Sequence, residues 1–404
     1  MSQTFLPYGR QCIEEDDIAA VVAVLRGDFL TTGPAVEFFE KALAERVEAR
    51  FAVACSSGTT ALHLAMAALE MGPEDKVAVP SMTFLATANA VQYVGAEVEF
   101  VDVDPRTGLA SPATFEQVIG GASGNRLRSL VPVHLAGQCV DMPGLAATAR
   151  RHNLRIVEDA AHALGTTYLD ENGETVPVGA CRHSDMTIFS FHPVKTVAMG
   201  EGGAVTTNDP ELYESLLRLR SHGMTRNASE FNQIDMAVAS DGSVNPWYYE
   251  MVEPGFNYRA TDIHCALGKS QLGKLSRFKE NRRKLVALYD RRIASLAPTV
   301  RPIQRVEGCD PGWHLYPVLI NFDAIGQDRA SLMLFLREQG IGSQVHYIPV
   351  HLQPYYQRRY GAMHLPGAET YYAQTLSLPL FVGMTDADVE RVVTGLAEVT
   401  GNAL

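Results

Sequence analysis

Cysteine is scarce in this sequence, and the cysteines never cluster. The six cysteines of the 404-residue chain are scattered from Cys12 to Cys309, and none forms a CxxC pair. This spread is typical of reduced thiols in a cytoplasm and argues against a disulfide framework or a zinc site. We therefore expect a cytoplasmic protein without a structural metal.

Long apolar runs and an excess of positive charge are also missing. No apolar run approaches the length of a membrane span, and Met1–Phe5 lacks the basic and apolar regions of a signal peptide, so no membrane association is expected. The 34 Lys and Arg residues against 46 Asp and Glu give a net charge of −12. That balance argues against sequence-independent nucleic-acid binding, although helix ends can still bind an anionic ligand.

The chain is long enough for two domains, and its first part alternates apolar strands with helices. Strands are expected at 51–55, 76–80, 98–103, 130–135, 154–159 and 186–191, and helices at 61–69, 86–94, 113–119 and 145–152. This order predicts an α/β fold, in which helices cover a parallel sheet.

The second part of the chain predicts a long functional loop and a smaller αβ domain. The stretch 221–254 is irregular and aromatic, and a long helical region follows at 262–296. Beyond it we expect strands at 314–322 and 342–347 and helices at 329–339 and 387–399. We place the large domain at 1–270 and the small C-terminal domain at 271–404.

Candidate site residues stand at or just after the ends of predicted strands. They are Ser57, Phe84, Asp159 and Lys195. Ligands of parallel sheets bind beyond the carboxyl ends of the strands, so these residues are expected on one rim. Burying a lysine beside strand ends is costly unless its amine is neutralised or used covalently. One such use is a Schiff base with pyridoxal phosphate (PLP).

The same rim could satisfy the other needs of PLP, which are a carboxylate, a phosphate cradle and a ring-stacking face. Asp159 could bind the pyridine nitrogen, and Phe84 could stack on the ring. Ser190 and the amides of Gly58 and Thr59 could hold the phosphate, with His162 beside the cofactor. Taken alone, each has a simpler interpretation: a surface lysine, a helix cap, a core aromatic or a core histidine. Their joint order along one rim favours PLP.

Nearly the whole chain resembles the DegT/StrS-type aminotransferases, which are PLP enzymes that aminate keto-sugar nucleotides. The segments that carry the resemblance are Leu6–Arg10, Ser57–Thr59, Glu158–Gly165, Phe189–Gly203, Ser221–Met224, Asn257–Arg259 with Thr261–Ile263, and Ser377–Leu380. Phe191–Lys195, Pro246–Glu250 and Gln344–His351 resemble the subgroup that aminates C4 in pseudaminic acid synthesis. Ser57–Thr60 and Thr196–Met199 depart from that subgroup, which puts the sugar in question and not the reaction.

The resemblance implies PLP fold type I, with a large, mainly parallel seven-stranded sheet domain and a smaller C-terminal αβ domain. It implies that Lys195 forms the Schiff base and that Asp159 pairs with the pyridinium. The implied cofactor contacts are Ser57, Gly58, Thr59, Phe84, Asp159, His162, Ser190, Lys195 and Asn257. By the same analogy Asn257 reaches the phosphate from the neighbouring subunit, so an active homodimer is expected.

The expected reaction transfers the amino group of L-glutamate to the 4-keto carbon of a nucleotide-linked 6-deoxy sugar, a UDP-linked N-acetylhexosamine in the first instance. Candidate substrate contacts, each of which could equally be packing, are Tyr8, His222, Trp247, His346 and His351. Alternatives are C3 or C4 amination of a dTDP- or GDP-linked keto sugar, a sugar dehydration, which Lys195 argues against, or a PLP-binding regulator without turnover.

Overall fold

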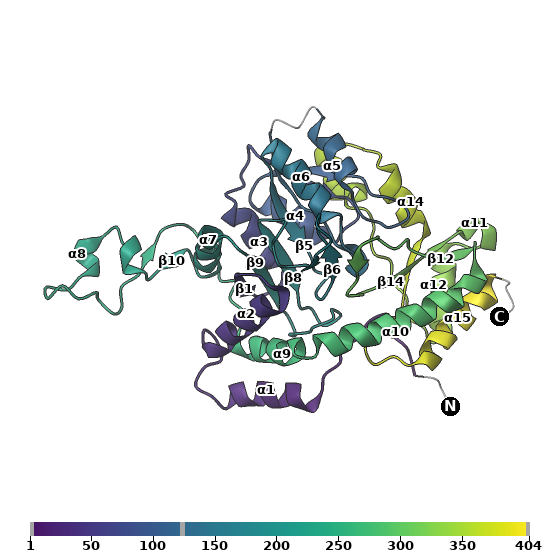
Figure 1. The fold of residues 1–404 in the computed structure, drawn as a ribbon, viewed down its shortest axis with the longest axis horizontal. Coiled ribbons are helices and arrows are strands. Elements are labelled where there is room, and N and C mark those ends of the chain that lie inside the picture. Colours follow the sequence, from purple (N-terminus) through teal and green to yellow (C-terminus); the bar gives the residue numbers. More distant parts are fainter. Residues whose placement is uncertain (1–3, 122–125, 401–404) are drawn as a thin grey trace.

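A seven-stranded sheet forms the centre of the computed structural model, which describes residues 4–121 and 126–400 (Figure 1). Its strands are β1 (Phe51–Cys55), β2 (Lys76–Pro80), β3 (Glu97–Val101), β4 (Leu127–Leu130), β5 (Arg155–Asp159), β8 (Met186–Ser190) and β9 (Gly203–Thr207). The spatial order is β1-β9-β8-β5-β4-β2-β3. Only β9 runs antiparallel to its neighbours within this sheet. The predicted mainly parallel sheet is confirmed.

The strands are apolar on both faces because helices cover both sides of the sheet. Along β1, Val53 and Cys55 enter one core, and Ala52 and Ala54 enter the other. The helices on the first side are α3 (Gly58–Ala68), α4 (Leu85–Tyr93) and α7 (Pro210–Arg220). Those on the second side include α2 (Pro34–Val47), α5 (Pro112–Ile119) and α6 (Met142–His152).

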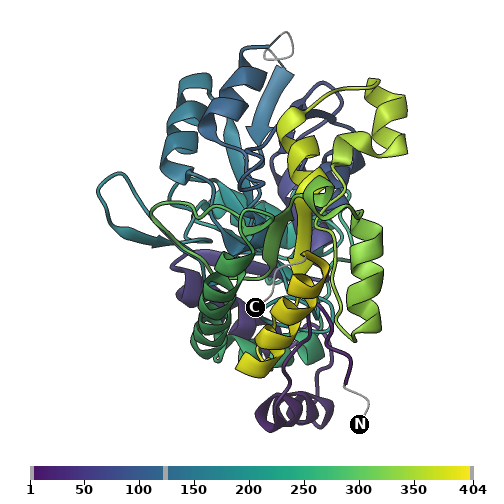
Figure 2. The ribbon, with the colours of Figure 1, turned by 90° about the vertical axis from the view of Figure 1, so that its right-hand side faces the viewer.

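The C-terminal part is built around an antiparallel sheet of three strands, β12 (Val300–Pro302), β14 (Tyr316–Ile320) and β15 (Thr375–Leu378). Its helices are α11 (Phe322–Ile325), α12 (Arg329–Glu338), α13 (Pro354–Tyr360), α14 (Pro366–Gln374) and α15 (Asp386–Thr400), with the short η5 (Val350–Leu352). The long helix α10 (Leu275–Ile293) lies beside α15 in both ribbon views (Figures 1 and 2). A boundary near residue 270 between the two parts remains our proposal.

Three predicted elements differ from the structure. The predicted strand at 130–135 shares only Leu130 with β4, and Leu135 begins the short helix η2 (Leu135–Gly137). The helical region 262–296 is broken into α9 (Asp262–Leu272), α10 and η4 (Ala294–Leu296). The predicted strand at 342–347 was wrong, because only Gln344 pairs with the neighbouring strand, at Ser377. The amide of Tyr347 instead donates to Met82 Sδ at 3.3 Å, and the chain here runs along a pocket wall.

Residues 221–257 form an arm that projects from the body of the molecule (Figure 1). The arm contains β10 (Met224–Thr225), η3 (Ala228–Glu230), α8 (Ile234–Ala237) and β11 (Glu250–Met251). The remaining elements are α1 (Glu15–Leu25), η2 (Leu135–Gly137) and a small sheet of β6 (Thr167–Leu169), β7 (Thr175–Pro177) and β13 (Cys309–Asp310). No helix in the described part of the chain is both long and apolar enough to span a membrane.

The contact between β9 and the turn before α3 gives a test of the fold. A Cβ on Gly203 would lie 2.1 Å from the carbonyl oxygen of Ser57, whereas a Cβ on Gly72 would meet nothing within 4 Å. We expect Gly203→Ala to lower the free energy of unfolding by about 1–3 kcal/mol and to displace the start of α3. Gly72→Ala is the matched control and should change stability little. Denaturant melts of both variants measure the difference, and equal stability would contradict the contact.

Candidate active site

One pocket collects most of the predicted site residues at the carboxyl end of the parallel strands. Its volume is about 600 Å³. The predicted residues that line it are Tyr8, Ser57, Gly58, Thr59, Phe84, Asp159, His162, Ser190, Lys195 and His346. They come from the ends of β1, β2, β5 and β8 and the turns that follow them, from the N-terminal segment that contains Tyr8, and from the C-terminal part. The fold therefore brings together segments that are far apart in the sequence.

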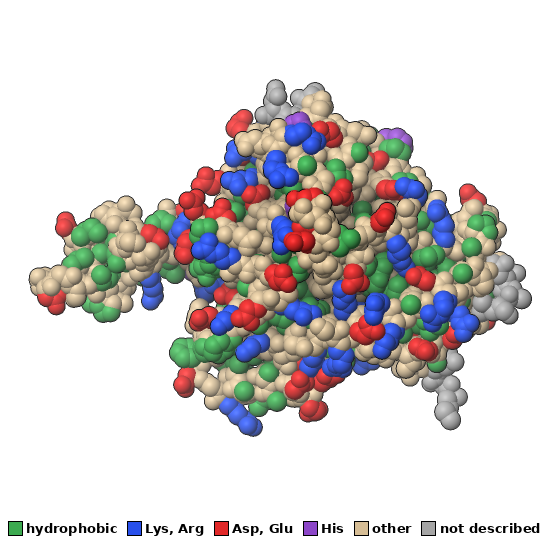
Figure 3. All heavy atoms as spheres, in the orientation of Figure 1, with side chains coloured by type: hydrophobic (Ala, Val, Ile, Leu, Met, Phe, Trp, Pro, Cys, Tyr) green, Lys and Arg blue, Asp and Glu red, His purple; other side chains and the backbone are tan. Residues whose placement is uncertain are grey.

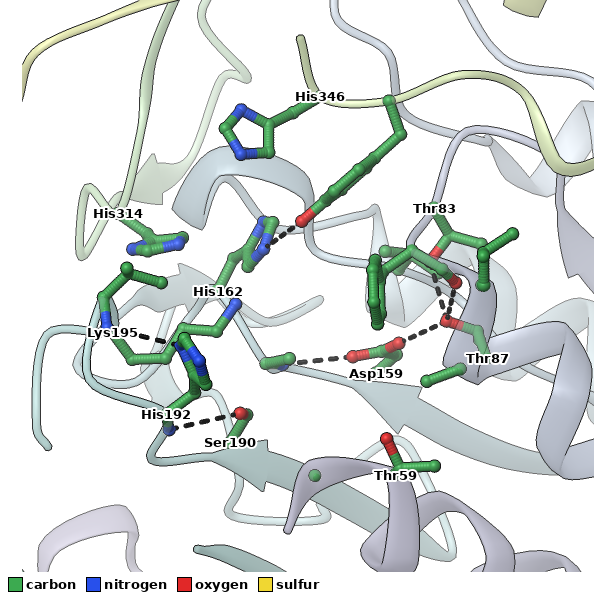
Figure 4. Close-up of a pocket in the computed structure, with 18 of the residues that line it drawn as sticks. Thr59, Thr83, Thr87, Asp159, His162, Ser190, His192, Lys195, His314 and His346 are labelled. Carbon is green, nitrogen blue, oxygen red and sulfur yellow. Dashed lines mark hydrogen bonds between the residues drawn. The ribbon is translucent and has the colours of Figure 1, made fainter. Parts of the chain in front are cut away.

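Lys195 lies on the loop that follows β8, and its side chain reaches into the pocket (Figure 4). The backbone amide of Lys195 donates to the carbonyl of His192 at 2.8 Å, which closes a tight turn after Pro193. Among the described residues, no carboxylate lies within 4.0 Å of its amine. Burial lowers the pKa of Lys195 to about 8, and the charge of Asp159 acts in the opposite direction. The amine is thus easily made neutral and nucleophilic.

Asp159 is the last residue of β5, and its buried carboxylate is held from two sides. Oδ2 accepts a hydrogen bond from Thr87 Oγ1 at 2.7 Å, and Oδ1 accepts one from the amide of Ala161 at 3.1 Å. Burial raises the pKa of Asp159, whereas these two donors and Lys195 oppose that rise. The carboxylate is fixed in orientation and faces the pocket, which suits it to bind a protonated ring nitrogen.

The start of α3 forms an anion cradle. Ser57 caps the helix by accepting from the amide of Thr60 at 3.1 Å. The amides of Gly58 and Thr59 have no acceptor within the helix, as is general for a first turn. Gly58 packs closely on Ser190, since a Cβ on Gly58 would lie 2.8 Å from the Cβ of Ser190, and this brings the Ser190 hydroxyl beside the free amides. Free amides at a helix start and a neighbouring hydroxyl are groups that bind a phosphate.

Phe84 and Thr87 place α4 against the same pocket. Phe84 stands at the N-cap of α4, and 55% of its side chain is exposed although its ring borders the pocket. An exposed aromatic face of this kind can stack on a flat ligand ring. Thr87 lies one helical turn later and bonds Asp159. Sequence reasoning missed Thr87, although the spacing of three residues from Phe84 could have indicated it.

A wall of aromatic and imidazole side chains faces the cradle. His162, His314 and His346 gather on the side of the pocket away from Ser190 and Thr59 (Figure 4). Burial is the main cause that lowers the pKa of all three, for His346 to about 3. Tyr347 completes this wall through a 2.9 Å hydrogen bond between its hydroxyl and His162 Nε2. Neither His314 nor Tyr347 was among the predicted site residues.

Four predicted residues do not line this pocket. His351 is buried, with Nδ1 2.6 Å from Ser81 Oγ and Nε2 3.3 Å from a carboxylate oxygen of Glu369. Trp247 is 71% exposed on the arm, and His222 and Asn257 are exposed at its base. The neighbouring-subunit role of Asn257 and the substrate roles of the other three stay predictions.

Known proteins share this architecture over their full length. The sequence pattern of the DegT/DnrJ/EryC1/StrS aminotransferase family matches residues 11–397. This chain belongs to that family. Over 402 residues it is 36% identical to the spore coat polysaccharide biosynthesis protein SpsC of Bacillus subtilis, covering 99% of this chain and 98% of SpsC.

Solved structures of family members superimpose closely. PseC of Helicobacter pylori, an aminotransferase involved in pseudaminic acid biosynthesis, has a TM-score of 0.87 at 27% identity, with 98% of this chain and 100% of PseC covered. The PLP form of Spr1654 from Streptococcus pneumoniae has a TM-score of 0.86 at 28% identity, with 98% and 99% covered.

The family member described here is therefore a PLP-dependent sugar aminotransferase of fold type I. The expected fold, cofactor and enzyme class are confirmed. The pocket also fits PLP on its own chemistry, because it joins a lysine of lowered pKa, a fixed carboxylate, a helix start packed against the Ser190 hydroxyl and an exposed aromatic ring.

The lowered pKa of Lys195 predicts how the apoprotein takes up PLP. The neutral amine reacts with the aldehyde, so the uptake rate should rise with pH and level off above a midpoint near 8. At pH 7 about one amine in ten would be neutral, against fewer than about one in a thousand for an ordinary lysine. Stopped-flow absorbance of apoprotein mixed with PLP measures this profile.

Asp159→Asn is the matched control, because it removes the charge that raises the pKa of Lys195. The midpoint of that variant should move to lower pH. A wild-type midpoint near 10 would show that the amine is not desolvated as the structure has it.

Proposed function

We propose that this enzyme transfers the amino group of L-glutamate to the 4-keto carbon of a nucleotide-linked 6-deoxy sugar, with a UDP-linked 4-keto-6-deoxy-N-acetylhexosamine as the first candidate. The observation that carries this proposal is a pocket with Lys195 and Asp159 on its sheet side and neutral polar side chains on the opposite wall. PseC, an aminotransferase involved in pseudaminic acid biosynthesis, supports the choice of sugar.

The residues on the sheet side would hold the cofactor. Lys195 would bond its aldehyde carbon, and Asp159 would accept a hydrogen bond from its ring nitrogen. Ser190 and the first amides of α3 would hold its phosphate, and Phe84 would cover one face of its ring. When bound, PLP supplies a carbon that carries the amino group between the two substrates and a ring that withdraws electrons.

Lys195 has a second role once its amine is released. Its Nζ can accept a proton from the α-carbon of the amino donor, and in the second half of the reaction it would deliver a proton to the sugar carbon that gains the amine, because its pKa near 8 lies close to working pH. Asp159 maintains the positive charge of the ring nitrogen, and Thr87 with the Ala161 amide keeps its carboxylate from rotating. These residues supply the proton chemistry that transamination requires.

The acceptor sugar is tested by offering the holoenzyme L-glutamate with UDP-, dTDP- and GDP-linked 4-keto-6-deoxy sugars and with a 3-keto analogue. We expect turnover of the UDP-linked N-acetylhexosamine and a new C4 amine in the NMR spectrum of the product. Lys195→Ala is the control and should give no product. Amination only at C3, or only of a dTDP- or GDP-linked sugar, would favour the alternative acceptors and reject the UDP-linked one.

We also propose that the active form is a homodimer in which each subunit completes the pocket of the other. Among the described residues that line the pocket, Lys195 is the only basic Lys or Arg side chain. The carboxylates of glutamate and the diphosphate of a nucleotide sugar need more positive charge than one lysine engaged with the cofactor supplies. A partner subunit is the natural source.

The arm supplies a second argument for the dimer. It projects away from the body, and hydrophobic side chains are visible along it (Figure 3). Its exposed apolar residues are Ile234, Met236, Val244, Trp247, Tyr249, Met251 and Val252. A thin two-stranded projection with this surface is marginally stable in water unless another surface covers it.

The dimer proposal predicts the effect of charges on the arm. Met236→Asp with Met251→Asp, at positions that are 65% and 66% exposed, should convert dimers to monomers and abolish turnover. Leu334→Asp on α12, at a position 62% exposed, is the matched control and should stay dimeric. Sedimentation velocity measures the state of each. A fully active monomer would reject the shared site.

A further inference from the structure

Tyr347 is held by a directed chain of hydrogen bonds that ends in the pocket. The backbone amide of Ala136 donates to His162 Nδ1 at 3.3 Å, and His162 Nε2 lies 2.9 Å from the hydroxyl of Tyr347. An amide can only donate, so Nδ1 must be the acceptor and carry no proton. The neutral imidazole then carries its proton on Nε2 and donates it to the tyrosine oxygen.

This order leaves the hydroxyl hydrogen of Tyr347 free to donate to a ligand. No other hydrogen bond is made by this hydroxyl within the described part of the chain. The His162 side chain stays neutral because burial lowers its pKa, and burial raises the pKa of Tyr347, so neither group loses this arrangement near neutral pH. Each bond in such a chain polarises the next, which strengthens the final donor.

Ala136, the first donor in this series of hydrogen bonds, has an unusual backbone conformation. Ala136 has a φ of 61°, a left-handed conformation that a non-glycine residue rarely adopts. In this conformation its amide reaches His162 and its carbonyl accepts from the amide of His314 at 3.0 Å. Strain of this kind persists where the surroundings fix it, often at functional sites. Ala136 therefore ties the sheet side of the pocket to the wall opposite the cradle.

We propose that Tyr347 donates its hydroxyl hydrogen to the keto oxygen of the acceptor sugar and so makes that carbonyl a better electrophile. This inference rests on the proposed keto-sugar acceptor. A carbonyl oxygen can only accept a hydrogen bond, which matches a hydroxyl whose own oxygen already accepts from His162. Tyr347 is then a catalytic residue of the acceptor half of the reaction, and His162 positions it.

The location of Tyr347 favours the sugar over the cofactor as its partner. The groups proposed to bind PLP stand at the strand ends and at the starts of α3 and α4, whereas Tyr347 comes from the C-terminal part and meets them at their edge, with its ring centroid 5.8 Å from that of Phe84. On the wall opposite the cradle, Tyr347 has His346 as its neighbour, with ring centroids 4.9 Å apart, and Tyr8 lies 5.5 Å from His346. The acceptor must enter between this wall and the cofactor.

Tyr347→Phe tests the proposal, because it removes one hydroxyl and keeps the ring. The two halves of the reaction are followed separately by the absorbance of the holoenzyme, first with L-glutamate alone and then, in the amine form, with UDP-linked 4-keto-6-deoxy-N-acetylhexosamine. If the wild type rejects that sugar, the dTDP-linked 4-keto-6-deoxyhexose replaces it, so failure of the sugar assignment is seen in the wild type alone.

We expect the acceptor half to slow by about 100-fold and the glutamate half to change by less than about threefold. The pH titration of the cofactor absorbance should be unchanged. Tyr356→Phe is the matched control, because it removes a hydroxyl bonded to Asn89 at 2.9 Å outside the pocket, and it should leave both halves unchanged. Equal slowing of both halves with a shifted titration would assign Tyr347 to the cofactor and overturn the proposal, as would no slowing.

A double-mutant cycle tests the positioning role of His162. His162→Ala should slow the acceptor half by about 10-fold, and adding it to Tyr347→Phe should slow that half little further, because both changes remove the same donor. The cofactor contact of His162 affects both halves and cancels when the two are compared. Additive effects on the acceptor half would show that His162 does not act through Tyr347.

Discussion

A lysine amine and an aspartate carboxylate share one buried pocket without neutralising each other, and the rest of the site depends on that separation. An ion pair between Lys195 and Asp159 would hold the amine charged and unreactive. The carboxylate instead takes its hydrogen bonds from Thr87 and the Ala161 amide, and burial moves the amine toward its neutral form. Placing the two groups at the ends of the parallel neighbours β5 and β8 keeps them close but apart.

Much of the fold and half of the site follow from local sequence. Continuous apolar runs give the strands, and their ends place Ser57, Asp159 and Lys195 on one rim, because side chains after parallel strands must meet at the same edge. Errors arise where the environment overrides the pattern. The stretch 342–347 was predicted as a strand, yet its backbone pairs only at Gly342, with Leu6, and at Gln344, with Ser377. Residues 344–347 line the pocket instead.

Two residues of the wall opposite the cradle, His314 and Tyr347, could not be predicted in the same way. Tyr347 and His162 are 185 positions apart in the sequence, and no local pattern at either residue indicates that the two side chains form a hydrogen bond. His314 looks like an ordinary residue before a buried strand, and only the fold shows that its ring centroid lies 4.5 Å from that of His162. Ala136 is less visible still, because nothing in an alanine indicates a left-handed backbone.

Because the wall opposite the cradle is neutral, it can orient a sugar, but the charged groups of the substrates must be bound elsewhere. Buried imidazoles of low pKa and a tyrosine of raised pKa carry no charge at neutral pH, so they can orient the oxygens of a sugar but cannot balance a carboxylate or a diphosphate. Positive charge inside the pocket would also push the pKa of Lys195 lower and compete for Asp159. In the proposed dimer, anion-binding groups on the partner subunit would leave each chain to set its proton chemistry independently of how tightly the charged ends of its substrates are bound.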